Sequence, residues 1–171
     1  MSNKILVTYA SRGGSTAGVA DAIGKTLVES GVQVDVCPMQ DVKDLTPYGA
    51  VVAGSAIQSA QWLPEAMRFM QTYRTTLAQK PFATFTVCMT LAMHNGKYHD
   101  AVANWLEPVR GLVKPVSEGY FAGALDIRKV PSFGDRLKFR LSVAMGVWSA
   151  GDHRDWNAIR TWAESLRPLL Q

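Results

Sequence analysis

The chain has 171 residues, of which 18 are Lys or Arg and 14 are Asp or Glu, so its formal net charge is +4. Its 47% apolar and 19% charged residues are typical of a globular protein and exclude a disordered or fibrous chain. The length favours a single domain over residues 1–171. Five of the bases and only one acid fall between Arg128 and Arg140, and the rest of the chain is neutral. We therefore expect a local basic patch and no nucleic-acid partner.

The two cysteines and the N-terminus indicate a cellular compartment. Cys37 and Cys88 are isolated, without the spacing of a zinc site or a disulfide framework, so we expect no metal. The chain passes from Met1 into a strand-like run without a leader pattern. No uncharged apolar run reaches the roughly 18 residues that span a bilayer. These features predict a cytoplasmic protein and leave open a peripheral attachment to the inner face of the cell membrane.

Strand-like and helix-like segments alternate along the chain. Apolar runs predict strands at residues 4–9, 48–54, 82–88 and 116–124, and apolar–polar alternation predicts one more at residues 32–36. Amphipathic spacing predicts helices ahead of Gly31, over residues 63–77, around residues 102–109 and over residues 155–166, the last capped by Asp152 or Asp155. This order predicts a doubly wound three-layer α/β domain with a five-stranded parallel sheet. Residues 125–151 exceed what the alternation needs, and they form an insertion before the last helix.

Three loops should lie at the carboxyl edge of this sheet, where open α/β sheets bind ligands. They cover residues 10–16, 55–62 and 89–97. The first contains Ser-Arg-Gly-Gly-Ser-Thr at residues 11–16, between a buried strand and a helix. Two glycines, three hydroxyls and a helix N-terminus suit a phosphate group. The alternative is an ordinary Gly-Ser turn that caps the helix.

The same hexapeptide resembles the phosphate loop of the flavodoxin family, which reads Thr/Ser-x-Thr-Gly-x-Thr, with Gly13 in place of a usual hydroxyl residue. The chain is most similar to a subgroup, the menaquinone-dependent protoporphyrinogen IX dehydrogenases and their flavodoxin-domain relatives. The motifs are Gly-Ser-Ala-Ile at residues 54–57, Gly-Tyr-Phe-Ala-Gly-Ala-Leu at residues 119–125, and Gly-Asp-His-Arg-Asp-Trp at residues 151–156. The resemblance runs nearly end to end and implies a flavodoxin-like αβα sandwich with a helical insertion.

The resemblance implies that FMN binds non-covalently and transfers electrons or hydride. Carried over by position, three groups of residues would hold it: Ser11, Arg12, Gly13, Gly14, Ser15 and Thr16 at the phosphate; Ser55, Ala56, Ile57 and Gln58 on one side of the isoalloxazine; and Val87, Cys88, Met89 and Thr90 on the other. Trp62 either stacks on the ring or packs in the core. In the third loop, His94, Tyr98 or His99 covers the flavin or meets a substrate, or is solvated surface. No catalytic acid or base can be assigned.

The insertion carries most of the basic patch on a predicted helix over residues 135–148. Leu137, Leu141, Ala144, Met145 and Trp148 share one face, and Arg136, Lys138 and Arg140 crowd its first turns. Three roles stay open for this helix. It lies on an anionic membrane surface, it frames a pocket for a porphyrin carboxylate or a quinone, or it packs on the domain with its bases solvated.

Three functional hypotheses follow. The first is an FMN-dependent oxidoreductase of the protoporphyrinogen dehydrogenase type, whose partners are a hydrophobic small-molecule substrate and a quinone. The second is a flavodoxin-like electron carrier that docks redox partners, which the charge of +4 disfavours because ordinary flavodoxins are acidic. The third is a flavodoxin fold that has lost FMN and acts through protein contacts. The sequence carries no signal for an oligomeric state.

Overall fold

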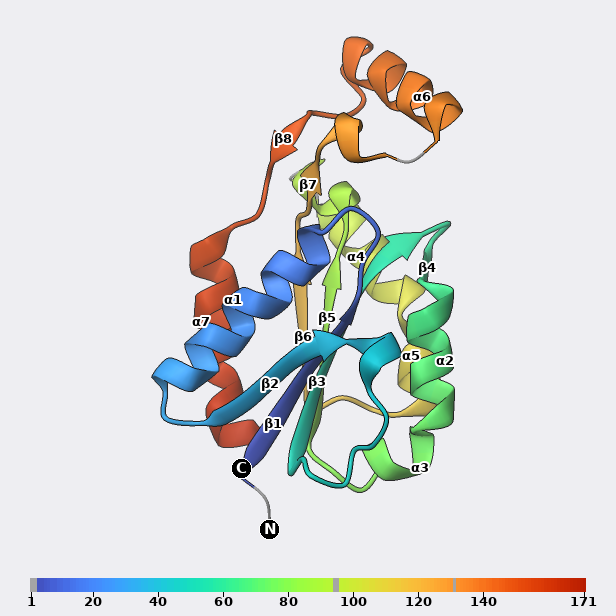
Figure 1. Cartoon of the computed structure of the whole chain (residues 1–171). Helices are drawn as coiled ribbons and strands as arrows, with labels where there is room; N and C mark the ends of the chain where they lie inside the picture. The colour runs from blue at the N-terminus through green and yellow to red at the C-terminus, as the bar shows by residue number, and fades with distance from the viewer. Residues whose placement is uncertain (1–2, 94–95, 131) are drawn as a thin grey trace.

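The computed structural model describes residues 3–93, 96–130 and 132–171. Five parallel strands form the central sheet in the order β2-β1-β3-β5-β6, which confirms the predicted five-stranded parallel sheet (Figure 1). The strands are β1 (Lys4–Ala10), β2 (Gln33–Pro38), β3 (Ala50–Gln58), β5 (Phe82–Val87) and β6 (Ser117–Phe121). One face of the sheet is covered by α1 (Ser15–Glu29) and α7 (Trp156–Leu166). The other is covered by α2 (Pro64–Thr72), α3 (Arg74–Leu77), α4 (Gly96–Trp105) and α5 (Glu107–Leu112). The three-layer α/β architecture is therefore confirmed.

The core consists of two apolar layers, one on each face of the sheet. Neighbouring residues of β1 point to opposite layers because side chains alternate along a strand. Leu6 joins the layer beneath α2 and α5, and Val7 joins the layer beneath α1 and α7. Both side chains are fully buried. Burial on both faces explains why the central strands read as continuous apolar runs in the sequence.

Four predicted segments before the fifth strand differ from those in the structure. Residues 55–62 are not a loop, because β3 continues to Gln58 and returns through β4 (Gln61–Trp62) as a hairpin. Its turn residues Ser59 and Ala60 have positive φ, a conformation their side chains do not predict. The helix predicted over residues 63–77 breaks into α2 and α3, and the next is interrupted between α4 and α5, where Pro108 opens α5. The predicted loop over residues 89–97 contains a short 3-10 helix, η2 (Met89–Met93), followed by α4.

The insertion leaves the sheet at its carboxyl edge and projects beyond it (Figure 1). The fifth strand ends at Phe121, earlier than predicted, and a separate antiparallel pair follows, β7 (Ala124–Leu125) with β8 (Gly151–Asp152). A further bond from the His153 N–H to the Gly123 carbonyl, at 3.1 Å, extends this ladder. Between the two strands lie η3 (Ile127–Lys129) and α6 (Phe133–Ala144). The helix therefore starts and ends earlier than the predicted range of 135–148, and Trp148 falls outside it.

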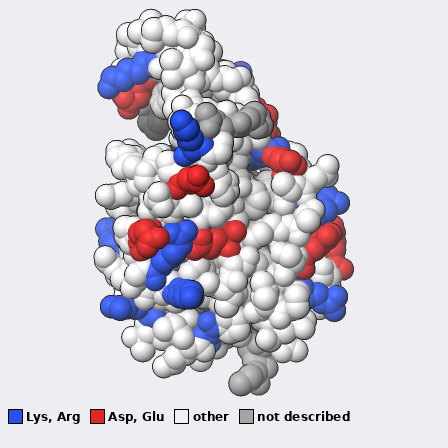
Figure 2. All heavy atoms as spheres, turned by 180° about the vertical axis from the view of Figure 1, so that it is seen from behind, with Lys and Arg blue, Asp and Glu red and all other residues white. Residues whose placement is uncertain are grey.

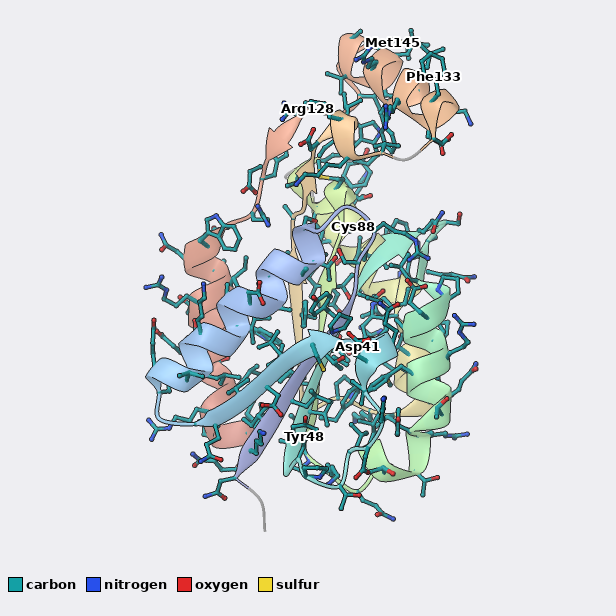
Figure 3. All side chains as sticks on the ribbon, in the orientation of Figure 1. Asp41, Tyr48, Cys88, Arg128, Phe133 and Met145 are labelled. Carbon is teal, nitrogen blue, oxygen red and sulfur yellow. The ribbon has the colours of Figure 1, made fainter. Side chains whose placement is uncertain are left out.

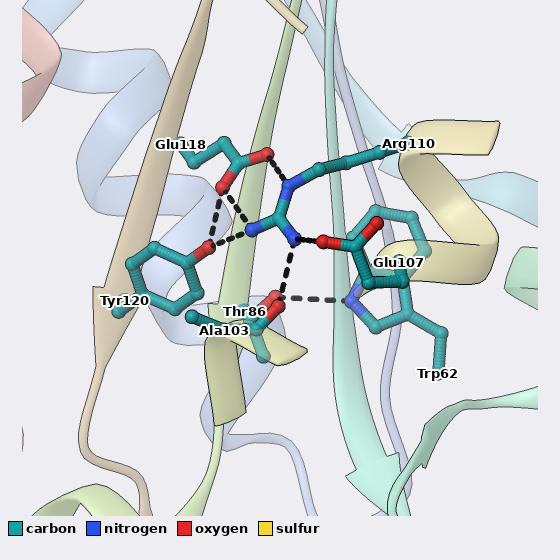
Figure 4. A network of polar contacts seen from close by, with 7 residues as sticks. All are labelled: Trp62, Thr86, Ala103, Glu107, Arg110, Glu118 and Tyr120. Atoms are coloured by element: carbon teal, nitrogen blue, oxygen red, sulfur yellow. Dashed lines mark hydrogen bonds and ion pairs between the residues drawn. The ribbon is translucent and has the colours of Figure 1, made fainter. Parts of the chain in front are cut away.

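On the side of the sheet opposite α1, a polar network connects α5 to β6 (Figure 4). Arg110 on α5 donates from Nε and Nη2 to the two carboxylate oxygens of Glu118 on β6, each at 2.7 Å. Tyr120 donates to the same carboxylate, and Arg110 Nη1 reaches Glu107 at 2.9 Å. The side chains of Arg110 and Glu118 are 26% and 20% exposed. Hydrogen bonds from Arg110 lower the pKa of Glu118, and burial followed by the bond to Glu118 raises the pKa of Tyr120 to about 12.

Candidate functional site

The phosphate-type loop follows β1 and leads directly into α1. Ser11 Oγ accepts a hydrogen bond from the Gly14 N–H at 3.1 Å, and Gly14 has a φ of +88°, which glycine adopts without strain. The turn leads to the N-terminus of α1, whose first N–H groups have no partners inside the helix. Thr16 lies in that first turn, and its Oγ1 is buried without a hydrogen-bond partner among the described residues. A buried, unpartnered hydroxyl beside a helix N-terminus fits a bound phosphate.

Two further features of the loop concern its charge and its space. A Cβ at Gly13 would meet no atom within 4 Å, so the position that usually carries a hydroxyl is open here. Arg12 turns away to α2, where its Nη2 donates to Glu65 at 2.9 Å and its Nη1 contacts the other carboxylate oxygen. These bonds lower the pKa of Glu65 and raise that of Arg12. The charge of Arg12 is therefore already matched by a carboxylate.

A cavity of about 420 Å³ opens beside this loop at the carboxyl edge of the sheet. It brings together residues from all three predicted loops. The predicted cofactor residues that line it are Arg12, Gly13, Gly14, Ser15, Ala56, Ile57, Gln58 and Met89. A phosphate pocket, a strand end and a neighbouring loop around one cavity fit the elongated shape of FMN, with its charged and apolar ends.

Two other predicted cofactor residues, Trp62 and Ser55, are buried and do not line the cavity. Trp62 is 3% exposed, and its indole N–H donates to Thr86 Oγ1 at 3.0 Å, so of its two possible roles the structure shows core packing. The Ser55 hydroxyl is fully buried, donates to the Ala56 carbonyl and accepts from the Leu63 N–H at 3.0 Å. Both side chains therefore hold the hairpin of β3 and β4 in place.

The remaining predicted residues belong to the strand end and the third loop. Val87 and Cys88 are buried at the end of β5, where Figure 3 labels Cys88, and Thr90 is half-buried outside the cavity lining. Exposed Tyr98 on α4 does not line the cavity, and the His99 ring packs 5.0 Å from that of Tyr120. His94 lies outside the described residues. Among the described residues of this group, no base is paired with a nucleophile.

The insertion forms one wall of the cavity, and the residues of this wall were not predicted individually from the sequence. Lys129 of η3, Val130 just after it, and Asp135 and Phe139 of α6 line the cavity opposite the sheet. Arg154, just after β8, also lines it. The sequence does contain a signal for Phe139, because Phe139, Val143 and Val147 form a second apolar stripe on the insertion helix, beside the stripe of Leu137 and Leu141. Periodicity defines such stripes but does not state which of them faces inward.

The three predicted basic contacts of the insertion have different surroundings. Arg136 is half-buried and its Nε donates to the Val130 carbonyl, so it holds α6 against the segment after η3. Lys138 is exposed and lies 3.6 Å from Asp135, and Arg140 is exposed. From behind, the part of the surface that α6 forms is mainly uncharged, with basic and acidic groups at its edge (Figure 2). Within the described part of the chain, no helix has the length and hydropathy needed to cross a bilayer.

Comparisons with known proteins agree with this geometry. A family model described as a flavodoxin domain matches residues 6–154. No match was found among curated protein sequences. Among solved structures, flavodoxin 2 from Bacillus cereus is 25% identical (84% of this chain, 99% of that one, TM-score 0.54). A Streptococcus pneumoniae TIGR4 flavodoxin is 15% identical (96% and 98%, TM-score 0.60).

A larger neighbour is the rubredoxin oxygen:oxidoreductase of Desulfovibrio gigas, which is 18% identical with a TM-score of 0.53. The alignment covers 99% of this chain but only 37% of that enzyme. The shared fold with these structures and the family match together imply that FMN is the cofactor. The chain belongs to the flavodoxin-domain family.

Proposed function

We propose that the chain is an FMN-dependent oxidoreductase that takes electrons from a hydrophobic, protoporphyrinogen-type substrate and passes them to a quinone. The observation that carries this proposal is the insertion, which walls the cavity from the side opposite the sheet. A carrier that meets large protein partners needs the flavin edge at its surface. An enzyme acting on small molecules instead needs an enclosed space beside the flavin, lined with apolar groups.

The chemistry of this wall supports a flat, apolar substrate that bears a carboxylate. Phe139 and Val130 offer apolar contact, and Lys129 offers a cation at the same wall. Asp135 and Asp126 also line the cavity and limit how much negative charge it accepts. When bound, FMN supplies the redox chemistry, and the residues of this chain bind and orient the reactants and exclude water.

The proposal is tested by anaerobic turnover of protoporphyrinogen IX with a menaquinone analogue, after visible spectra have established FMN binding. We expect turnover by the wild type, and a raised KM for Lys129→Gln and Phe139→Ala with unchanged FMN affinity. Flavin that is reduced only by a protein donor, with no turnover of the small molecules, would instead establish the electron-carrier hypothesis. A protein that leaves the spectrum and fluorescence of added FMN unchanged would refute both.

We propose further that the outer face of α6 docks on an anionic lipid bilayer, where a quinone is dissolved. Phe133, Leu137, Leu141 and Met145 follow one another at intervals of four and are 81%, 58%, 59% and 66% exposed. Figure 3 shows Phe133 and Met145 at the two ends of this outlying helix. Lys138 and Arg140 flank the stripe, while Asp135 and Phe139 face the cavity. Exposed apolar residues between bases are complementary to a surface of anionic headgroups over acyl chains.

Sedimentation with vesicles tests the docking. We expect wild-type protein to bind phosphatidylglycerol vesicles and not pure phosphatidylcholine vesicles. Leu137→Glu with Leu141→Glu, and separately Lys138→Gln with Arg140→Gln, should each abolish binding while FMN affinity stays unchanged. Arg167→Gln, a loss of one exposed charge at the far end of the domain, is the matched control. Equal binding to both vesicles, or a dimer in solution that Leu141→Glu dissociates, would overturn the membrane proposal.

A further inference from the structure

Arg154 lies beside the first turns of α1, although it is far from the phosphate loop in sequence. It lines the same cavity as Gly13, Gly14 and Ser15. A Cβ built on Gly18, in the second turn of α1, would lie only 2.5 Å from Arg154 Nη1. The guanidinium therefore occupies the space that a side chain at position 18 would take. Glycine inside a helix costs stability relative to alanine, so this close approach explains its presence there.

The Arg154 side chain is held in one orientation by three contacts. Its Nε and Nη2 donate to the two carboxylate oxygens of Asp152, each at 2.7 Å. Its guanidinium carbon lies 4.5 Å from the centre of the Trp156 ring, a cation–π distance. The side chain is only 18% exposed. In the described part of the chain, no hydrogen bond engages Nη1, the nitrogen beside α1.

The phosphate loop itself offers few hydrogen-bond donors and little positive charge to a phosphate. Gly13 lacks a hydroxyl, Arg12 is paired with Glu65, and the Thr16 hydroxyl is buried without a partner. The helix N-terminus alone supplies a partial charge of about half a unit, whereas the phosphate of FMN carries close to two negative charges at neutral pH. A preorganised guanidinium N–H beside that helix is the strong type of phosphate donor.

We propose that Arg154 donates from Nη1 to the phosphate of FMN and thereby makes the site selective for FMN over riboflavin. The inference rests on the proposed FMN site. Asp152 cancels the charge of Arg154 at long range. The gain in FMN affinity therefore comes from a directed hydrogen bond and not from long-range attraction of the phosphate. FMN affinity should accordingly depend only weakly on salt concentration.

The experiment measures the Kd values of FMN and riboflavin by fluorescence quenching, because riboflavin lacks only the phosphate. For Arg154→Gln we expect FMN affinity to fall about tenfold to a hundredfold, the value of a hydrogen bond to a charged group, while riboflavin affinity stays unchanged. Arg154→Lys should recover part of the FMN affinity. Gly18→Ala, which displaces the guanidinium, should reproduce the selective loss, and Arg167→Gln should behave as wild type.

Each other result overturns the inference in a recognisable way. Equal losses for FMN and riboflavin in Arg154→Gln would mean that Arg154 only supports the fold. Unchanged affinities would mean that it does not reach the phosphate. A wild-type protein that binds neither flavin would refute the FMN site itself, whereas selective FMN binding that survives Arg154→Gln would refute only the role of Arg154.

Discussion

The helices α7 and α6 are similar in sequence pattern and opposite in surroundings. Each begins with a side-chain cap: Asp155 accepts from the Ala158 N–H at 2.9 Å, and Ser132 accepts from the Asp135 N–H at 3.4 Å. Each carries an apolar stripe. The stripe of α7 is buried against the sheet, whereas that of α6 faces away from the protein. Periodicity therefore defines a helix and its stripe, and only the fold decides whether that stripe stabilises the protein or is offered to another surface.

The largest effect is expected for a substitution in the buried stripe of α7. Leu166 of α7 is fully buried, so Leu166→Ala leaves a cavity and should lower the free energy of unfolding by about 2–5 kcal/mol. Urea denaturation followed by circular dichroism measures the change. A loss below about 1 kcal/mol would show that α7 is not part of the main core.

A smaller effect is expected for the polar network on the opposite face of the sheet. Glu118→Gln should cost about 2 kcal/mol at pH 7, because hydrogen bonds to charged groups are worth that much when partly buried. The pKa of Glu118 is lowered in the folded protein, so its contribution is complete above the ordinary pKa of a glutamate and disappears as the pH falls through the folded-state value.

The stability difference between wild type and Glu118→Gln should therefore shrink below about pH 4. Lys138→Gln, which removes an exposed ion pair with Asp135 on α6, is the matched comparison and should leave stability unchanged at any pH. A pH-independent deficit for Glu118→Gln would contradict the assigned role of its carboxylate.

A third test removes the insertion. Replacing residues 127–149 by a short turn between β7 and β8 should change the free energy of unfolding by only about 1 kcal/mol, because the entropic cost of closing a loop grows slowly with its length. The same change opens one wall of the cavity, so iodide should quench bound FMN more strongly. Loss of the folded domain would show that the insertion is part of the core.

The smallest effect is expected for a substitution in the exposed stripe of α6. Leu137 of α6 is 58% exposed, so Leu137→Ala should change stability by less than about 0.5 kcal/mol, in contrast to the same substitution at Leu166. Thermal unfolding of the two variants side by side makes the measurement. A large loss at Leu137 would mean that α6 packs against the domain and has no free face for a bilayer.

The parts of the fold that local pattern controls could be predicted. Apolar runs, and apolar–polar alternation at residues 32–36, predicted the five strands, and Asp155 was one of two predicted caps. The hairpin of β3 and β4 could not be predicted, because Ser59 and Ala60 adopt positive φ under the constraint of the strands on either side. The pairing of β7 with β8 involves two residues from each strand, too few to leave a pattern.

The candidate site, like the fold, could be predicted only where local sequence pattern controls it. Its loops were predicted because strand ends of a parallel sheet converge, and eight of the predicted cofactor residues do line one cavity. Arg154 was missed because its position depends on a contact with α1 across more than 130 residues of sequence. Two signals pointed to it: the motif at residues 151–156, which contains Arg154, and Gly18, a glycine inside a helix without a turn to explain it. Trp62 illustrates the converse, because an aromatic residue near a loop also suits the core.

The pairing of β7 with β8 has a consequence for how such proteins diversify. Since Leu125 faces Gly151 across this ladder, the two ends of the insertion leave the domain as immediate neighbours. Because its two ends are neighbours, the segment between them can change in length and composition without moving a strand of the sheet. A single ancestral scaffold could in this way acquire new substrates or cellular surfaces by replacing one piece of chain, and an engineer could do the same.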